Sequence, residues 1–340
     1  MAYTTIAKPN QYFNTLLYTG DGSASDRTIT GVGFQPDWLW NKSRSNAYNH
    51  YIFDVLRGTN MLSSNATLAQ EDKSPQFSAF TSDGFTIRND AGSLAINASG
   101  VTFANWCWKA NGAGVSNTDG STTSTVSANQ TSGFSVVKWV GVDTTVGHGL
   151  NAVPEMIIVK NIDDASHWFV YHKSIGNGKF LTLNETGVEQ TSSTIWNATS
   201  PTSSVFTVGS GLNNANYIAY VFAPKKGFSK MGLYEGNGSD NGTFVYTGFK
   251  PAFVLYKAKG AVQSWNIQDN KRLGYNPNNA FLFPNLAQAE SDITRIDLLS
   301  NGFKLKTSDA GQNGSGQGYI YMAFAENPIV TTDGLPATAR

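Results

Sequence analysis

The chain has 340 residues, with 24 Lys plus Arg and 24 Asp plus Glu, so its formal net charge is zero. This balance excludes both the basic stripe of a nucleic-acid-binding protein and the acidic composition of a disordered tail. Only 14% of the residues are charged, so Asn, Ser, Thr and Gly must hydrate the surface, which is typical of rigid β proteins.

The sequence contains no apolar run of membrane-spanning length and starts with neither a basic nor an apolar stretch. We therefore expect a chain made in the cytoplasm without export or membrane insertion. A single cysteine, Cys107, rules out an intrachain disulfide and is expected to be a small core residue.

Residues 1–15 are expected to form an N-terminal arm, followed by a first β-sandwich repeat over 16–110. Its opening strand carries "PDWLWNK", in which Pro36 marks the strand entry. Trp38, Trp40 and Lys42 share one face because strand side chains alternate. We expect the tryptophans to enter a sandwich core and Lys42 to place its amine in water at the edge of that core.

The second half of this repeat carries further landmarks. Asp54 follows Lys42 by twelve residues, "LSSN" ends on Asn65, and an aromatic-rich strand closes the repeat at Ala110. The spacing predicts a lysine–aspartate contact at the rim of the first hairpin. Arg57, three residues after the aspartate, is interpreted as a structural brace of the loop.

Residues 111–132 contain almost only small polar residues and are expected to be a linker. The landmarks then recur with identical spacing from proline to lysine and on to the twelfth residue, in a second repeat over 133–224 and a third over 225–327. They are Pro154, Lys160, His172 and Asn184, then Pro251, Lys257, Asp269 and Asn285. Residues 328–340 are expected to be a C-terminal tail. Turn pairs such as Asp-Gly and Asn-Gly recur throughout, so we predict an all-β chain of three tandem β-sandwich, jelly-roll-like modules.

Catalytic and metal-binding patterns are weak. The four histidines match no zinc spacing, there is no Gly-x-Ser-x-Gly elbow, and the adjacent carboxylates lie in polar loops. We therefore assign no catalytic residue, metal ligand or cofactor, and interpret the histidines as surface or rim residues. Asp21, Asp26 and Asp240 lie in turns for which calcium binding stays open.

Recognition is expected in the loops that join the first two strands of each repeat. The candidate residues are Tyr48 and His50 in loop 43–50, and Asp163 and Asp164 in loop 161–167; loop 258–264 is the third. Trp196 and Tyr275 are two further aromatic residues in polar surroundings.

Several phrases carry a family resemblance, namely "VGFQPDWLWNKSRS", "YIAYVFAPKKGFSKMGLYEGNG", "FVYTGFKPAFVLYK" and "YIYMAFAENP". With them the chain resembles, over almost its full length, a family of repeat proteins from marine bacteriophages that are described as tail-fibre-like. The resemblance implies a virion-associated structural protein without enzymatic activity.

We therefore expect a virion protein, assembled in the host cytoplasm, that acts in host adhesion. The alternative is a capsid-decoration or head-fibre protein bound to the coat lattice. The expected partners are other virion proteins and a host surface glycan or receptor, with no nucleic acid; homo-oligomer formation stays open.

Overall fold

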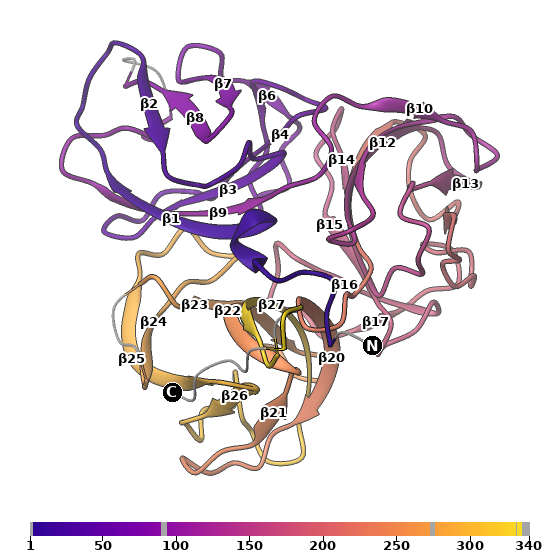
Figure 1. The fold of residues 1–340 in the computed structure, drawn as a ribbon. Helices are drawn as coiled ribbons and strands as arrows, with labels where there is room; N and C mark the ends of the chain where they lie inside the picture. The colour runs from indigo at the N-terminus through magenta and orange to yellow at the C-terminus, as the bar shows by residue number, and fades with distance from the viewer. Residues whose placement is uncertain (1–2, 90–93, 273–275, 331, 335–340) are drawn as a thin grey trace.

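The computed structural model describes residues 3–89, 94–272, 276–330 and 332–334. Within these residues the regular structure is β except for one short 3₁₀ turn, η1 (Pro9–Gln11). The prediction of an all-β chain of three tandem sandwich modules is confirmed, and the modules form three lobes (Figure 1). No helix in the described ranges is long and apolar enough to cross a membrane.

Module 1 is a sandwich of two antiparallel sheets. Its inner sheet has the order β1 (Phe13–Thr19), β9 (Thr102–Trp108), β3 (Trp38–Ser43), β4 (Tyr51–Asp54). Its outer sheet has the order β2 (Arg27–Thr30), β8 (Gly84–Ile87), β7 (Phe77–Thr81), and β5 (Asn60–Met61) pairs with β6 (Glu71–Asp72).

Module 2 repeats the inner order as β12 (Phe134–Val140), β19 (Asn216–Phe222), β14 (Met156–Asn161), β15 (Trp168–His172). This sheet continues beyond β15 into β16 (Lys179–Thr182) and β17 (Gln190–Thr191), and its outer layer is β13 (Thr144–Gly147) with β18 (Val205–Val208). The prediction of a linker over 111–132 is wrong, because these residues contribute two strands, β10 (Val115–Asn117) and β11 (Ser124–Asn129), to the edge of this sheet. Strands at a sheet edge need little apolar content, so composition did not reveal them.

Module 3 has the inner order β20 (Ser229–Glu235), β27 (Gly318–Pro328), β22 (Phe249–Ala258), β23 (Asn266–Asp269). Its outer sheet is β21 (Phe244–Tyr246), β26 (Gly302–Leu305), β25 (Ser291–Leu299), β24 (Asn278–Phe281). The repeated landmarks therefore occupy equivalent places. Pro36 and Pro154 precede β3 and β14 by two residues, and Pro251 lies at a register irregularity in β22, where a missing N–H is tolerated.

The inner sheets bury their two faces in different cores. In module 1, Leu39, Phe53 and Cys107 fill the space between the two sheets of the sandwich. Trp38 and Trp40 are fully buried, as predicted, but they belong to a second cluster that draws residues from all three modules. The expectation of a sandwich core for these tryptophans is therefore corrected: their face of the strand builds the junction between modules.

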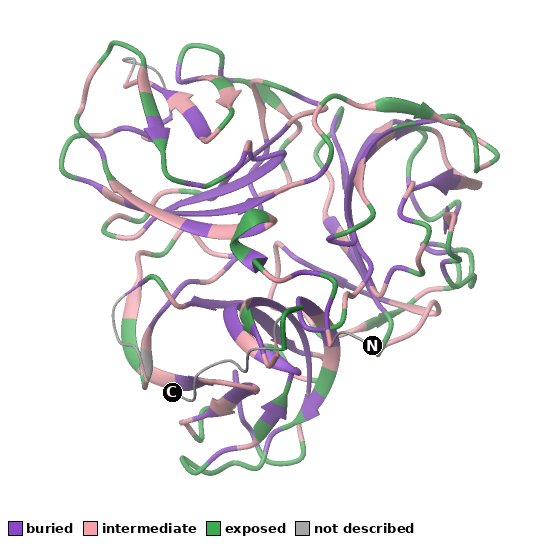
Figure 2. Ribbon diagram, in the orientation of Figure 1, coloured by how far each residue is buried: buried purple, intermediate pink, exposed green. Residues whose placement is uncertain are grey.

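This junction core is dense in aromatic rings. The Trp38 ring lies 4.3 Å from the Tyr220 ring of module 2 and 4.2 Å from the Trp108 ring of its own module. Phe13 stacks on Phe324 of module 3 at 5.1 Å. The buried strands of the three lobes face one another at the centre (Figure 2). Aromatic burial on this scale makes the modules one packed body.

The first residues also join modules, instead of forming the free arm expected for residues 1–15. The Tyr3 hydroxyl donates to the Gly248 carbonyl of module 3 at 2.6 Å, Ile6 lies in the junction core, and Phe13 begins β1. The described part of this segment therefore crosses from the last module to the first.

Candidate functional site

The residues expected in recognition differ sharply in exposure. Tyr48 is half-buried, and His50 is fully buried with both ring nitrogens engaged. Asp163 and Asp164 are exposed, although one Asp163 oxygen, Oδ2, accepts bonds from the backbone N–H and side-chain amide of Asn216, at 2.7 and 2.8 Å. Only the second pair thus offers side chains to solvent.

All three predicted loops lie at junctions between modules. Each forms a backbone hydrogen bond with the segment that follows the landmark asparagine of a neighbouring module. These bonds run from the Ser166 N–H to the Thr67 carbonyl (2.8 Å), from the Gln263 N–H to the Thr186 carbonyl (3.0 Å) and from the Glu290 N–H to the Arg44 carbonyl (2.8 Å). The loops are therefore anchored connections.

A second set of equivalent bonds starts from an aromatic side chain at, or directly before, the start of the second strand of each module, β4, β15 or β23. The ring nitrogens of His50, Trp168 and Trp265 face the carbonyls of Phe283, Ser63 and Thr182, each at 2.9 Å. Module 1 thus contacts module 3, module 3 contacts module 2, and module 2 contacts module 1. The three modules close into a ring with approximate threefold symmetry.

The landmark asparagines position these rings. The Oδ1 atoms of Asn65, Asn184 and Asn285 accept the backbone N–H groups of His50, Trp168 and Trp265 at 2.9, 2.9 and 3.0 Å. Asparagine therefore recurs because a short side-chain acceptor fixes the start of the second strand.

The three landmark lysines are buried, so the prediction that they place their amines in water is wrong. Each Nζ donates to the carbonyls of the first and fourth following residues: Ser43 and Asn46, Asn161 and Asp164, Ala258 and Ala261. Burial lowers the pKa of each amine from 10.5 to about 8. The amines hold the bases of the three loops from inside.

Lys42 has one further bond, because its Nζ also reaches the Ala287 carbonyl of module 3 at 3.2 Å. We expect Lys42→Met to lower the free energy of unfolding by about 2–3 kcal/mol, since buried acceptors lose their donor. Denaturant unfolding measures this change. The exposed control Lys271→Met should change little, and equal effects of the two substitutions would contradict the buried role of Lys42.

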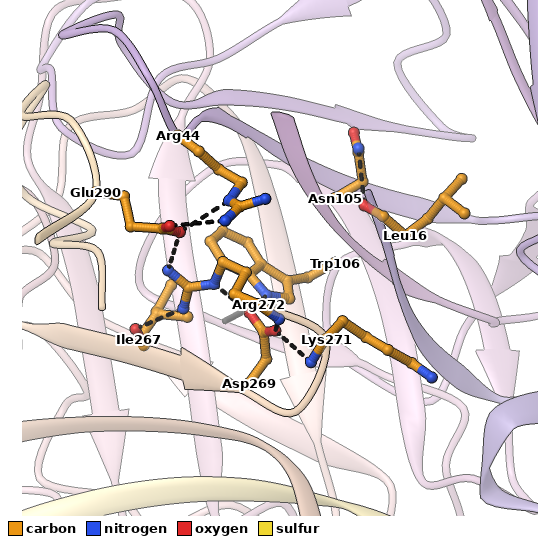
Figure 3. Close-up of polar contacts among 9 residues, drawn as sticks. All are labelled: Leu16, Arg44, Asn105, Trp106, Ile267, Asp269, Lys271, Arg272 and Glu290. Carbon is orange, nitrogen blue, oxygen red and sulfur yellow. Dashed lines mark hydrogen bonds and ion pairs between the residues drawn. The ribbon is translucent and has the colours of Figure 1, made fainter. Parts of the chain in front are cut away.

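A buried polar network joins modules 1 and 3 (Figure 3). The Arg44 guanidinium binds Glu290 through two hydrogen bonds, at 2.8 and 3.0 Å. Arg272 donates to the same carboxylate at 3.0 Å and to Asp269 Oδ2 at 2.7 Å. Trp106 Nε1 donates to that Asp269 oxygen at 3.0 Å. Every charge in this network meets an opposite charge, which is the arrangement that a buried ion pair requires.

The module 1–2 junction uses the same scheme. Asp54 Oδ2 accepts bonds from Arg57 Nε at 2.7 Å and from the Tyr220 hydroxyl of module 2 at 2.9 Å. The brace role of Arg57 is thus confirmed, and Arg272 makes the equivalent bond to Asp269 in module 3. The lysine–aspartate rim contact is wrong, because Asp54 lies opposite Trp38 and pairs with Arg57 instead.

At the module 2–3 junction His172 replaces the aspartate. Its Nδ1 accepts the Ser174 backbone N–H at 3.1 Å, and its Nε2 faces the Tyr321 carbonyl of module 3 at 3.2 Å. These partners define a neutral ring with the proton on Nε2. His50 and His148 are also fully buried, so the expected surface or rim location is corrected for three of the four histidines.

The buried histidines predict sensitivity to acid. Burial lowers the pKa of His172 from 6.5 to about 4. Because the unfolded state binds the proton first, the contribution of neutral His172 to the free energy of unfolding is fully present above about pH 6.5. It is lost as the pH falls from about 6.5 to 4, and this loss amounts to about 3 kcal/mol. Burial, followed by the charge of Lys42, also lowers the pKa of His50.

This loss can be measured by urea unfolding across the pH range. His172→Gln has no titrating ring and can keep a donor and an acceptor. It should therefore lose less stability than the native chain on acidification. Parallel pH profiles of the two proteins would refute the assignment.

The remaining candidates have local structural partners. Asp21 and Asp240 accept backbone N–H groups of Ser23 and Ser308, both at 2.8 Å. Trp196 is buried and donates to the Lys179 carbonyl, whereas Tyr275 lies outside the described residues. Within the described ranges, no group of three or more His, Cys, Asp or Glu side chains could hold a metal ion.

These features define an all-β protein of three sandwich modules that are locked into a ring. A model of one family, described as "Domain of unknown function (DUF7483)", matches residues 8–328, and the chain belongs to this family. The match spans all three modules, which are therefore parts of one family domain. No curated protein and no solved structure matches the chain.

Proposed function

We propose that the protein is a non-enzymatic structural component of a phage virion, with a tail-fibre-like role in recognition of the host surface. The phage assignment rests on the sequence resemblance. The observation that carries recognition is the arrangement of the three loops between the first and second strands. Their bases are held by buried lysines and by bonds between modules, and their tips are exposed.

The exposed tip residues differ among the modules. They are Ser45, Ala47 and Asn49 in module 1, Asp163, Asp164 and Ala165 in module 2, and Gly260 and Val262 in module 3. Equivalent loops in a threefold ring lie at the same height along its axis. Rigid presentation of varied loops suits recognition, because little entropy is lost when a preorganised loop binds.

The test separates tip residues from anchor residues. Replacement of Asp164 and Ala165 by Ser, together with Ala47 by Lys, leaves all three lysines, His50 and the hydrogen bonds of Ser45 and Asn49 in place. We expect an unchanged melting temperature and reduced attachment of the purified protein to host cells. Full attachment by this folded variant would remove these two tips from the recognition surface.

Capsid decoration is the second candidate, favoured by the compact ring, which has no extended shaft in the described residues. Electron microscopy of virions labelled with an antibody against the chain separates the two roles. Label at the tail or baseplate supports adhesion, and regular label over the head supports decoration.

A further inference from the structure

The outer edges of equivalent inner sheets are occupied differently in modules 2 and 3. In module 2, β12 pairs with β19 on one side and with β11 on the other, where Thr125 lies opposite Lys138 and Ser127 opposite Val136. The equivalent strand in module 3, β20, pairs with β27 and ends the sheet order. Figure 1 shows β20 at the rim of its lobe, beside β21.

The backbone of β20 is oriented to accept a further strand. The Gly236 N–H donates inward to Gln317, and the Glu235 carbonyl accepts the Thr243 hydroxyl on the other side. Since peptide groups alternate along an antiparallel strand, the N–H groups of Met231 and Leu233 point toward the open edge. Unpaired groups of this kind form a template for another strand.

The side chains along this edge are apolar and exposed. Leu233 is 48% exposed, and Phe244 and Tyr246 on β21 are 44% and 51% exposed. They line a groove of about 450 Å³ between β20 and β21, which continues past Lys230 and Tyr246 into a second groove of about 630 Å³. Large exposed apolar side chains that gather along one groove usually mark an interaction site.

Charged residues do not protect the middle of this edge. Lys230 turns its amine to the Tyr246 carbonyl at 2.7 Å, so it ties β20 to β21. Gly232 and Leu233 follow it and carry no charge. Natural edge strands are commonly protected by charge, proline or a bulge, and the described edge shows none of these between Met231 and Tyr234.

We propose that the β20 edge accepts an extended strand from a different protein, antiparallel to β20, with apolar side chains at alternate positions. Module 2 provides the precedent, because β11 fills the equivalent edge in that orientation. The connection from β19 into β20 is residues 223–228, too short to fold back as the 25 residues 109–133 do between β9 and β12. This inference holds for either proposed function, since it concerns how the protein is joined to a partner.

The probe is a synthetic peptide of residues 122–131 that carries T125V and S127V, so that its valines face Leu233 and Met231. Hydrogen exchange with the full chain should show the Met231 and Leu233 amides at least about tenfold slower with peptide. Leu233→Pro removes one outward N–H and is tolerated on an edge. It should weaken binding at least about tenfold, or 1.4 kcal/mol, whereas the control Leu233→Val should bind normally.

Hydrogen exchange on the native chain tests the proposed strand binding even if Leu233→Pro does not fold. Absence of peptide protection at β20 would overturn the proposal, as would equal binding by the folded proline variant. If these amides are already protected without peptide, another strand covers the edge in the protein itself. A protein of monomer mass would then have a segment of its own chain on the edge, and a protein of dimer mass would have a second copy there. Either result contradicts a strand from a different protein.

Discussion

Arg272→Met is expected to lower the free energy of unfolding by about 3–5 kcal/mol, the usual cost of removing one partner from a buried ion pair. The Arg272 and Asp269 side chains are fully buried, and Glu290 is only 15% exposed. Without Arg272, Asp269 keeps the Trp106 N–H and two backbone donors but loses the guanidinium that binds it at 2.7 Å. Glu290 keeps its two hydrogen bonds from Arg44 and loses the one from Arg272.

The matched control for this prediction is Arg88→Met. Arg88 pairs with Asp26 at 3.3 Å, but both side chains are at least one-third exposed, and exposed pairs contribute about 0–1 kcal/mol. Urea unfolding of the two variants measures the difference. A loss for Arg272→Met as small as that of the control would show that the network does not stabilise the junction.

Trp40→Ala is expected to cost about 3–5 kcal/mol, the usual penalty for truncating a large buried aromatic residue. The ring is fully buried in the junction core, and its Nε1 donates to His50 Nδ1 at 2.8 Å. The substitution therefore opens a cavity and leaves His50 without its donor. Because His50 contacts module 3, the loss should be felt across the module 1–3 junction.

Trp40→Phe isolates the second part of this effect. Phenylalanine keeps most of the apolar surface but cannot donate to His50, so it should cost about 1–3 kcal/mol for the unsatisfied acceptor. Thermal melting and cell attachment are measured on both variants. A Trp40→Ala protein of native stability that no longer attaches to cells would reveal a binding surface in place of a core residue.

Internal repetition predicted much of this fold, because equal spacing of Pro36, Lys42 and Asp54 with their counterparts requires equivalent strands. The two-residue period also showed that Trp38, Trp40 and Lys42 share a face. It could not show which layer that face meets, since either side of a buried sheet can be apolar. The junction core therefore became visible only in three dimensions.

The buried polar groups were harder to predict. Lysine is rarely buried, and the acceptors of Lys42, Lys160 and Lys257 are backbone carbonyls, which no residue type reveals. A signal did exist for the ion pairs, because Glu189 and Glu290 each follow the landmark asparagine by five residues. Each glutamate pairs with one residue of its own module and with one of another module, Lys259 for Glu189 and Arg44 for Glu290. Sequence spacing carries no information on the contact between modules.

The candidate loops were located correctly between the first and second strands, but their surroundings were not. A loop in a separate sandwich would have a free tip and a free base. Closure of the ring buries the base and also buries His50, which sequence reasoning placed at the tip. What stays exposed, including Asp163 and Asp164, is the part of the prediction that the proposed recognition role now uses.

Differential scanning calorimetry tests most directly whether the three modules form one unit around a shared core. We expect a single transition in which the calorimetric and van't Hoff enthalpies agree, and Arg272→Met should move that whole transition to lower temperature. Three separable transitions, with Arg272→Met shifting one and leaving the others in place, would contradict the closed ring.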